Sequence, residues 1–378
     1  MRVLMNGIPL LSSHCGVGTY IYQLSTALAG ISTQLEMLYF YGSSFANKMK
    51  TGKVSSFRNA RKASNRVHVL YRALHFAKEL SFKWRLPSQK IDVYHETNYI
   101  PMPFRGPTVV SVFDLSLHLW PQTHPKNRRD YFKRHFYRRL PWASHFIVIS
   151  EATKAQMIEY LNISPDKITV THLGVSPNIT PIPAENAKRV MSHYGLTYGS
   201  YLLYVGTLEP RKNITALLQA YALMPKRTQS CFPLILAGGR GWLMDHIEDE
   251  INRLGIASTT RITGYVLSKH LPALYSGAKV FIYPSLYEGF GLPPLEAMAC
   301  GTPVITSNVS SLPEVVGDAG ILIDPHDINR LKSEIEHLIE DSSQRNLLRN
   351  LGLERSKQFT WEACARKTLD AYSYALQV

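Results

Sequence analysis

Short, nearly continuous apolar runs alternate with segments of helical length along the whole chain. Five such runs are four or five residues long and rich in branched or aromatic side chains: Val109–Phe113, Phe146–Ile149, Tyr201–Val205, Leu234–Ala237 and Val280–Tyr283. A strand that is apolar on both faces has to be covered on both faces, as in a parallel sheet between two layers of helices. The pattern therefore predicts an α/β protein with open parallel sheets.

The length and the charge distribution indicate two such sheets. The chain has 378 residues, which is too long for one ordinary domain. A proline-rich stretch at 174–183 is typical of a linker. Residues 1–185 carry 23 Lys and Arg against 10 Asp and Glu, whereas the remaining residues carry 19 against 18. We therefore expect two doubly wound domains, 1–185 and 186–360, and an anionic partner for the basic first domain.

Composition and cysteine spacing exclude several other classes of protein. Hydrophobic residues make up 45% of the chain and charged residues 19%, which argues against disorder. The four cysteines are scattered and favour a reducing compartment over a disulfide scaffold or a zinc ribbon: Cys15, Cys231, Cys300 and Cys364. No apolar run approaches the ~20 residues of a membrane-spanning helix. Because Met1–Met5 is interpreted as a first strand rather than a signal peptide, we expect a cytoplasmic protein.

A glycine-bearing turn follows that first strand. Gly16 and Gly18 precede an amphipathic pattern formed by Tyr20, Leu24 and Leu28. Backbone N–H groups at the start of a helix bind phosphate, so this turn is a candidate phosphate contact. A tight turn without a ligand is the alternative, because the full dinucleotide fingerprint is absent.

A second candidate site, Gly206–Asn213, follows the first strand of the second domain. Ligands of open α/β sheets bind at the carboxyl ends of strands, where this loop is expected. Arg211 and Lys212 would suit a diphosphate, the arginine as a planar fork and the lysine as a point charge. A solvated basic pair is the alternative.

The most specific motif contains Glu288, a Gly-Phe-Gly turn at 289–291, and Glu296. The preceding strand would deliver Glu288 to the carboxyl edge of the sheet. A helix beginning near Pro293 would place Glu296 in its first turn. The alternative is a surface acid plus a residue that complements the helix dipole, and it leaves the two glycines unexplained.

Glu288 and Glu296, with seven residues between them, resemble the paired-glutamate motif of the retaining GT4 glycosyltransferases. That family has the GT-B architecture of two facing Rossmann-like domains. Further segments follow the family's order: Gly16–Gly18, Gly206–Asn213, Ala237–Trp242, Thr263–Val266 and Leu312–Val315. The resemblance covers nearly the whole chain, strongly over 200–330 and loosely over 30–90. It implies that 361–378 is a helix that crosses back to the first domain.

The resemblance also implies roles for individual residues. Glu296 would accept hydrogen bonds from the ribose of a sugar nucleotide, and Glu288 would hold the hydroxyls of the donor sugar. Arg211 and Lys212 would neutralise the leaving diphosphate in place of a metal, so neither a metal nor a cofactor is expected. The remaining implied donor contacts are Gly16, Gly18, Gly206, Tyr265, Val266, Gly289, Phe290, Gly291 and Leu292.

One position departs from the family. Many relatives have a histidine immediately before the aspartate that follows the strand starting near Val109, and here that residue is Phe113. Asp114 and His118 are the candidate contacts with the acceptor or the sugar. The other histidines considered as substitutes are His95, His124 and His172.

Two basic segments lie in the first domain. Residues 48–90 carry 12 Lys and Arg and one acidic residue. Lys126–Arg139 has helical spacing, and four aromatic residues are interleaved with its cations: Tyr131, Phe132, Phe136 and Tyr137. We expect a surface for anionic lipid or lipid-diphosphate acceptors, with aromatic side chains such as Phe132, Phe136 and Tyr137 reaching the interface. A solvated basic helix and a nucleic-acid surface are the alternatives, and we expect no nucleic-acid partner.

The sequence thus predicts a retaining transferase that moves a hexose from a nucleotide-diphosphate sugar to a glycan or lipid-linked glycan, peripherally at the inner face of the membrane. Gly239–Trp242 together with Gly206–Asn213 resembles polysaccharide mannosyltransferases, which favours GDP-mannose. UDP-glucose, UDP-galactose and UDP-N-acetylglucosamine are alternative donors. A nucleotide-sugar epimerase and a non-catalytic polyanion-binding protein are the alternatives from other classes.

Overall fold

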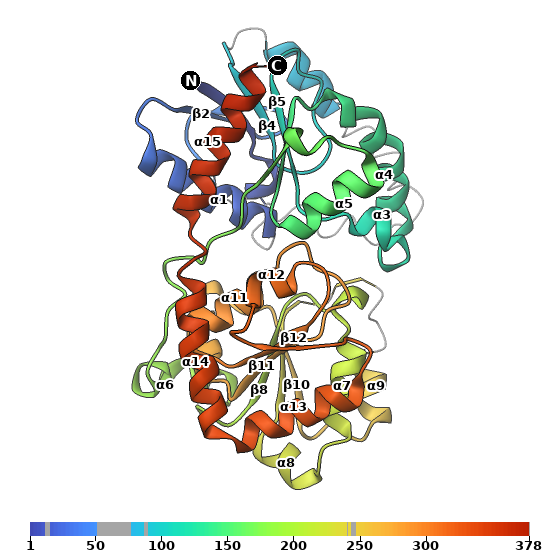
Figure 1. Cartoon of the computed structure of the whole chain (residues 1–378), viewed down its shortest axis with the longest axis vertical. Helices are drawn as coiled ribbons and strands as arrows, with labels where there is room; N and C mark the ends of the chain where they lie inside the picture. Colours follow the sequence, from blue (N-terminus) through green and yellow to red (C-terminus); the bar gives the residue numbers. More distant parts are fainter. Residues whose placement is uncertain (12–15, 51–76, 87–89, 240, 243–246, 378) are drawn as a thin grey trace. The chain divides into compact units, whose positions relative to one another are not determined.

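The computed structural model describes residues 1–377 except 12–15, 51–76, 87–89, 240 and 243–246. It consists of two compact units, each built around one sheet (Figure 1). Unit 1 comprises Met1–Leu117, Lys126–Gly174 and Trp361–Val378, and unit 2 comprises His118–Pro125 and Val175–Thr360. The prediction of two α/β units with open parallel sheets is confirmed.

The sheet of unit 1 has seven strands in the order β3-β2-β1-β4-β5-β6-β7. The strands are β1 (Arg2–Asn6), β2 (Glu36–Phe40), β3 (Phe45–Ala46), β4 (Val93–Glu96), β5 (Thr108–Val112), β6 (His145–Val148) and β7 (Ile168–Val170). Every residue of β4, β5 and β6 is buried, as their apolar sequences require. The short edge strand β3 pairs antiparallel with β2, which the sequence did not indicate.

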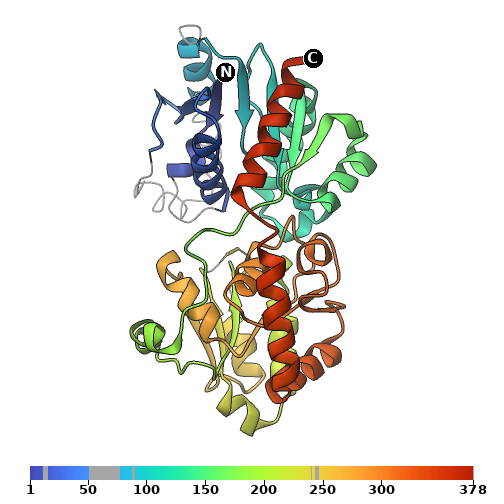
Figure 2. The same ribbon diagram turned by 60° about the vertical axis from the view of Figure 1, so that its left-hand side comes forward.

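Helices flank this sheet on both faces. They are α1 (Gly16–Ile31), a helix over 77–85, α4 (Lys126–Arg139), α5 (Glu151–Leu161) and α15 (Trp361–Gln377), with α3 (Ser116–Leu119) where unit 1 passes to unit 2. The last helix, α15, packs against α1 and crosses β4 to β7. Figure 2 shows α15 as the red helix of unit 1.

Helix α4 is amphipathic, with a buried stripe made by Phe132, Phe136 and Arg139. Phe132 and Phe136 stack on each other with their ring centroids 4.3 Å apart. Both rings lie in the core of unit 1, so the expectation that they reach lipid is wrong. The exposed face carries most of the cations, and Tyr137 alone of the four interleaved aromatic residues is exposed.

The sheet of unit 2 has six parallel strands in the order β10-β9-β8-β11-β12-β13. They are β8 (Leu202–Val205), β9 (Leu234–Ala237), β10 (Thr260–Gly264), β11 (Val280–Tyr283), β12 (Val304–Ser307) and β13 (Ile321–Ile323). The helices are α6 (Ala184–Tyr194), α7 (Ile214–Ala222), α8 (Lys226–Cys231), α9 (Ile247–Arg253), α10 (Leu271–Gly277), α11 (Leu292–Ala299), α12 (Leu312–Val316), α13 (Ile328–Glu340) and α14 (Ser342–Ser356). The strand order reverses between β8 and β11, which makes the carboxyl ends of these two strands the switch point of the sheet.

Unit 2 begins at Val175 rather than at the expected residue 186, because the proline-rich segment is hydrogen-bonded to unit 2. The backbone N–H of Ile182 donates to Ser276 Oγ at 2.9 Å, and the Tyr198 hydroxyl donates to the Ile182 carbonyl at 2.9 Å. Residues 118–125 also group with unit 2, where the Trp242 indole donates to the Thr123 carbonyl at 2.6 Å.

The charge asymmetry follows the structural units. Unit 1 carries 25 Lys and Arg against 11 Asp and Glu, and unit 2 carries 17 against 17. The whole net charge of +14 therefore belongs to unit 1. None of the described helices is long and apolar enough to cross a bilayer.

Candidate functional site

Two loops of unit 2 meet at the switch point of its sheet. One follows β8 and contains the short 3₁₀ helix Pro210–Lys212, and the other follows β11 and contains Glu288. The backbone N–H of Leu286 donates to the Arg211 carbonyl at 2.9 Å. The Arg211 guanidinium in turn donates to the Tyr287 carbonyl at 2.8 Å. These bonds join the two expected site segments, although 76 residues separate Arg211 from Tyr287 in the sequence.

The charged side chains of these loops form a buried quartet. Lys212 Nζ lies 2.5 Å from Glu288 Oε1 and donates to the Tyr283 hydroxyl at 2.9 Å. Arg211 Nη2 lies 2.8 Å from Glu209 Oε1, and Arg211 Nη1 lies 3.5 Å from Glu288 Oε2. None of the four charged side chains is more than 12% exposed. Two cations and two carboxylates sum to zero, so the quartet holds its cations in fixed positions without a net buried charge.

The pKa of Glu288 reflects this pairing. Burial disfavours its charged form, but Lys212 and Arg211 outweigh burial and hold the pKa of the carboxyl below its usual range. Glu288 is therefore an anion at neutral pH. An anion with both oxygens beside cations is suited to orient hydroxyl groups of a ligand rather than to donate a proton.

The backbone around Glu288 is held by the loop that follows β12. The Glu288 N–H donates to Ser310 Oγ at 2.9 Å, and Ser311 Oγ donates to the carbonyls of Glu288 and Phe290 at 2.9 and 2.7 Å. Gly291 then caps α11 with φ +117°, and a Cβ there would lie 2.9 Å from a methyl of Leu312. Only glycine adopts that conformation readily, so the residue type is required for the turn into the helix.

Glu296 has a different environment from Glu288. It is the fifth residue of α11 and not in the first turn as expected, because the helix begins at Leu292. The Tyr275 hydroxyl donates to Glu296 Oε2 at 2.9 Å. Burial raises the pKa of Glu296 to about 7, and the tyrosine bond opposes this only in part. The pKa values of the two glutamates are therefore shifted in opposite directions, a pattern found at functional sites.

The other expected donor contacts of unit 2 lie at the same edge of the sheet. Gly206 follows β8, and a Cβ on neighbouring Gly238 would lie 1.8 Å from the Gly206 carbonyl oxygen, so the two loops need a glycine to approach. Tyr265 and Val266 follow β10, the first exposed and the second buried. Arg240, within the expected Gly239–Trp242 segment, lies outside the described residues.

Unit 1 contains the expected phosphate contacts Gly16 and Gly18 and the expected acceptor contact Asp114. Gly16 and Gly18 are the first and third residues of α1, so their N–H groups belong to the first turn of a helix. The neighbouring residues His14 and Cys15 lie outside the described residues, as does most of the basic segment 48–90. Asp114 follows β5, and its Oδ1 accepts hydrogen bonds from the Ser116 N–H at 2.9 Å, the Ser116 hydroxyl at 2.7 Å and the Tyr99 hydroxyl at 3.2 Å.

The histidines considered for the position of Phe113 differ in placement. His95 is fully buried, with Nδ1 2.8 Å from the Tyr372 hydroxyl and Nε2 2.7 Å from Ser111 Oγ. Burial lowers its pKa to about 3, so it is a neutral packing residue between the sheet and α15. His124 is also buried and lies against the ring of Trp242. His118 and His172 are partly exposed.

The sequence reasoning missed four residues that shape the quartet: Glu209, Tyr283, Ser310 and Ser311. Glu209 stands beside the basic pair, and a carboxylate there was a signal that the cations are paired rather than solvated. Ser310 and Ser311 follow a strand at the carboxyl edge of the sheet, and that position was the available signal for them.

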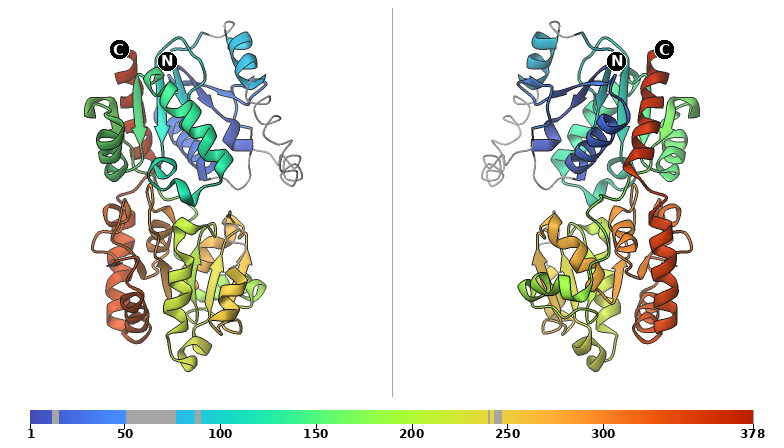
Figure 3. Two further views of the ribbon diagram at one scale, coloured as in Figure 1. Left: turned by 90° about the vertical axis from the view of Figure 1, so that its right-hand side faces the viewer. Right: turned by 90° about the vertical axis from the view of Figure 1, so that its left-hand side faces the viewer.

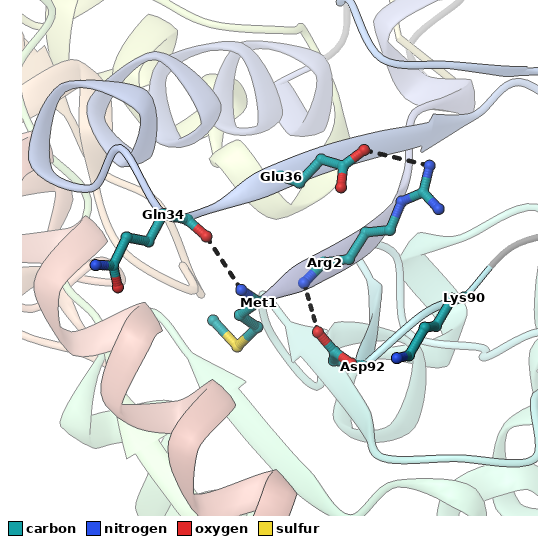
Figure 4. Close-up of a pocket in the computed structure, with 6 residues that line it drawn as sticks. All are labelled: Met1, Arg2, Gln34, Glu36, Lys90 and Asp92. Carbon is teal, nitrogen blue, oxygen red and sulfur yellow. Dashed lines mark hydrogen bonds and ion pairs between the residues drawn. The ribbon is translucent and has the colours of Figure 1, made fainter.

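A cavity of about 340 Å³ lies elsewhere, at the amino edge of the sheet of unit 1 (Figure 4). It is lined by Met1, Arg2, Gln34, Glu36, Lys90 and Asp92. Arg2 pairs with Glu36 at 3.2 Å, and its N–H donates to Asp92 at 2.7 Å. Ligands of open α/β sheets bind at the opposite, carboxyl edge, so this cavity is not the candidate site. Among the described residues, no three His, Cys, Asp or Glu side chains are grouped to hold a metal ion.

Comparison with known proteins defines the class. Residues 15–179 match the family described as "Glycosyltransferase Family 4", and residues 197–355 match "Glycosyl transferases group 1". The solved structure of a sucrose-phosphate synthase from Thermosynechococcus elongatus has the same fold, with a TM-score of 0.77 over 98% of each chain at 22% identity. These family matches, together with the two doubly wound units, define a glycosyltransferase of GT-B architecture.

Two sequence relatives are named as mannosyltransferases. The chain is 37% identical over 385 residues to the "O-antigen chain mannosyltransferase B" of Escherichia coli, with 98% of this chain and 99% of that relative covered. It is 33% identical over 239 residues to the "Serotype-specific mannosyltransferase WbdA" of Escherichia coli, which covers 62% of this chain and 29% of that longer relative. The chain belongs to the GT4 family of retaining glycosyltransferases, which confirms the prediction of the family and of the enzyme class. The roles of individual site residues stay predictions.

Proposed function

We propose that this enzyme transfers mannose from GDP-mannose to a sugar hydroxyl of a growing, lipid-linked polysaccharide, with retention of configuration. The observation that carries the proposal is the 37% identity, spread over the full length, to a relative named as a mannosyltransferase of the O-antigen chain. The shorter match to a second relative named as a mannosyltransferase supports the choice of sugar.

The quartet supports a mechanism without a metal. As the bond to the sugar breaks, negative charge collects on the leaving diphosphate, and Arg211 and Lys212 would stabilise it. Their positions are fixed beforehand by Glu209 and Glu288, so little reorganisation is needed when the charge develops. We propose that the diphosphate shares these cations with the carboxylates rather than displacing them.

The two motif glutamates would then bind different parts of the donor. Glu288, an anion held by Lys212, would accept hydrogen bonds from the hydroxyls of mannose and orient its anomeric carbon. Glu296 would accept from the ribose hydroxyls. Because Glu296 is partly protonated near pH 7, the binding of two hydroxyl donors would favour its ionised form and couple donor binding to proton release.

A lipid-linked acceptor lies at a membrane surface, and the enzyme has to approach it. We propose that unit 1, which carries the whole net charge of +14, contacts the anionic cytoplasmic leaflet peripherally. Unit 2 is neutral and would stay in solution.

The test is donor and product analysis of the purified enzyme. A water-soluble mannose oligosaccharide serves as the acceptor, and each of GDP-mannose, UDP-glucose, UDP-galactose and UDP-N-acetylglucosamine is supplied in turn. We expect mass spectrometry to show extension of the acceptor with GDP-mannose alone, and NMR of the product to show the anomeric configuration of the donor. An Arg211→Ala variant controls for contaminating activity. Extension from a UDP-sugar, or release of an isomerised donor without an acceptor, would contradict the proposal.

A further inference from the structure

The helix over 77–85 in unit 1 carries its largest side chain on the outside. Trp84 is 80% exposed and Leu80, one turn earlier on the same face, is 44% exposed. The opposite face holds the helix in place, because Phe82 is fully buried in the core against Phe40 and Tyr94. Leu80 and Trp84 therefore give the outer face of this helix an apolar character.

An ion pair connects this helix to the end of α4. Figure 3 draws the helix over 77–85 in light blue and α4 in blue-green, both in unit 1. Arg139, the last residue of α4, lies 2.6 Å from Glu79 Oε1 and donates to the Pro101 carbonyl at 3.0 Å. Its guanidinium also lies over the ring of Trp142, 5.0 Å from the centroid, and Trp142 is 43% exposed. The buried arginine therefore ties the helix over 77–85 to the end of α4, next to the exposed Trp142.

The same two segments carry exposed cations. Lys83 comes from the helix over 77–85, and Arg134 and Arg138 lie on the exposed face of α4. In the part of the chain that the structure describes, these three side chains contact no carboxylate. We name the aromatic–basic surface by its six residues: Leu80, Lys83, Trp84, Arg134, Arg138 and Trp142.

We propose that the aromatic–basic surface docks on an anionic lipid bilayer. Tryptophan concentrates at the boundary between headgroups and hydrocarbon, where its ring is apolar and its N–H stays hydrated. Lysine and arginine beside it reach the phosphates of the headgroups. The net charge of +14 on unit 1 complements such a leaflet.

The proposal also replaces part of the sequence-based expectation. The apolar anchors are Trp84, Leu80 and Trp142, and not Phe132 and Phe136, which are buried. The docking proposal rests on the proposed function only for the reason to dock, which is to bring the enzyme to a lipid-linked acceptor. The docking itself can be measured without any sugar transfer.

The experiment is sedimentation of the full chain with vesicles of phosphatidylcholine, alone or with about one third phosphatidylglycerol. We expect pelleting with the anionic vesicles, release as salt rises, and no pelleting with the neutral vesicles. Each cation at such a surface contributes about fivefold to the partition constant, so Lys83→Glu together with Arg138→Glu should lower it more than about 25-fold. Leu80→Ser together with Trp84→Ser should lower it at least about tenfold.

A control variant removes two exposed leucines from unit 2. Leu223 and Leu347 are 55% and 52% exposed, and their double serine variant should pellet like the wild type. All substituted side chains are exposed, and circular dichroism melts would verify that each variant folds. Trp84→Phe should keep the binding and lose part of the fluorescence blue shift that vesicles produce in the wild type.

Several results would overturn the proposal. They are the absence of pelleting at low salt, equal pelleting with neutral vesicles, and Leu80→Ser with Trp84→Ser pelleting like the wild type. A change of oligomeric state in that variant without a change in vesicle binding would identify an interface between copies of the chain instead. Transfer to a water-soluble acceptor separates the two proposals. It should be unchanged in the vesicle-binding variants, and its absence in the wild type would contradict the proposed function alone.

Discussion

The buried pair of Lys212 and Glu288 allows a quantitative prediction. Lys212→Met removes one partner of a contact at 2.5 Å and leaves Glu288 buried, with Arg211 at 3.5 Å as its remaining cation. Breaking a buried ion pair in this way typically costs 3–5 kcal/mol, and because Arg211 remains we expect about 3 kcal/mol of the free energy of unfolding to be lost. For a unit of this size the melting temperature should fall by about 6–12 °C.

The assay is thermal unfolding by calorimetry at neutral pH, with a matched surface pair as the control. Lys357 lies 2.6 Å from Glu354, almost the same separation, but the two side chains are 68% and 72% exposed. Lys357→Met should therefore cost less than about 1 kcal/mol. The difference between the two lysine variants isolates the effect of burial.

A double variant completes the test. Replacing both partners by apolar side chains removes the unpaired charge, so Lys212→Met with Glu288→Met should melt above Lys212→Met alone. It should also remain inactive, because both groups are proposed to contact the donor. The reasoning is refuted if Lys212→Met melts like Lys357→Met, or if the double variant loses the sum of the two single effects.

Three further predictions concern the donor site. Burial raises the pKa of Glu296 from its usual 4.5 to about 7, so the folded chain holds this proton more tightly and stability falls as pH rises through that range. Calorimetry of the wild type against Glu296→Gln should accordingly show the wild type losing about 1–2 kcal/mol relative to the variant between pH 5 and pH 7.5, and no difference in slope would contradict the assignment. Glu296→Ala should weaken donor binding about 10- to 150-fold in titration calorimetry, with Glu288→Ala affecting turnover more than affinity. Transfer should survive EDTA, whereas Arg211→Ala should lower turnover about 10²- to 10³-fold in steady-state kinetics, and restoration of chelated enzyme by a divalent ion would argue against the proposed cations.

The sequence predicts those parts of this fold that depend on local patterns. Val280–Tyr283 is apolar at every position, so it can only be a strand covered on both faces, and the structure has β11 there. The helix after it is bounded by prolines near its start and by Gly301 just past its end. The helix begins one residue before Pro293, at Leu292, because proline is tolerated throughout the first turn and does not mark its first residue.

Features that depend on pairing between distant segments could not be predicted from the sequence. Lys212 and Glu288 are 76 residues apart, and nothing in either segment shows that they neutralise each other. Ser311 fixes the Glu288 loop from a third segment. In α4 the stripe of Phe132, Phe136 and Arg139 has the spacing of a core-facing face, and that spacing was the available signal that the two rings are buried. The outward position of Trp84 is set by Phe82 on the other side of the helix, which depends on the tertiary core.

The position of α15 has a consequence for how the chain is made. Its inner face is buried against the rest of unit 1 through Trp361, Ala365, Thr368 and Tyr372. The Tyr372 hydroxyl is also the hydrogen-bond partner of Nδ1 of the buried His95. Unit 1 is therefore discontinuous, and the ribosome has to synthesise the whole of 175–360 before its last helix exists, roughly 10–40 s at usual elongation rates. During that interval the apolar face of α1 has no covering helix. In the nascent chain, the segments of unit 1 that are synthesised first are thus the most accessible to chaperones and proteases. A stalled or truncated product would be recognised at these segments rather than at its most recently synthesised end.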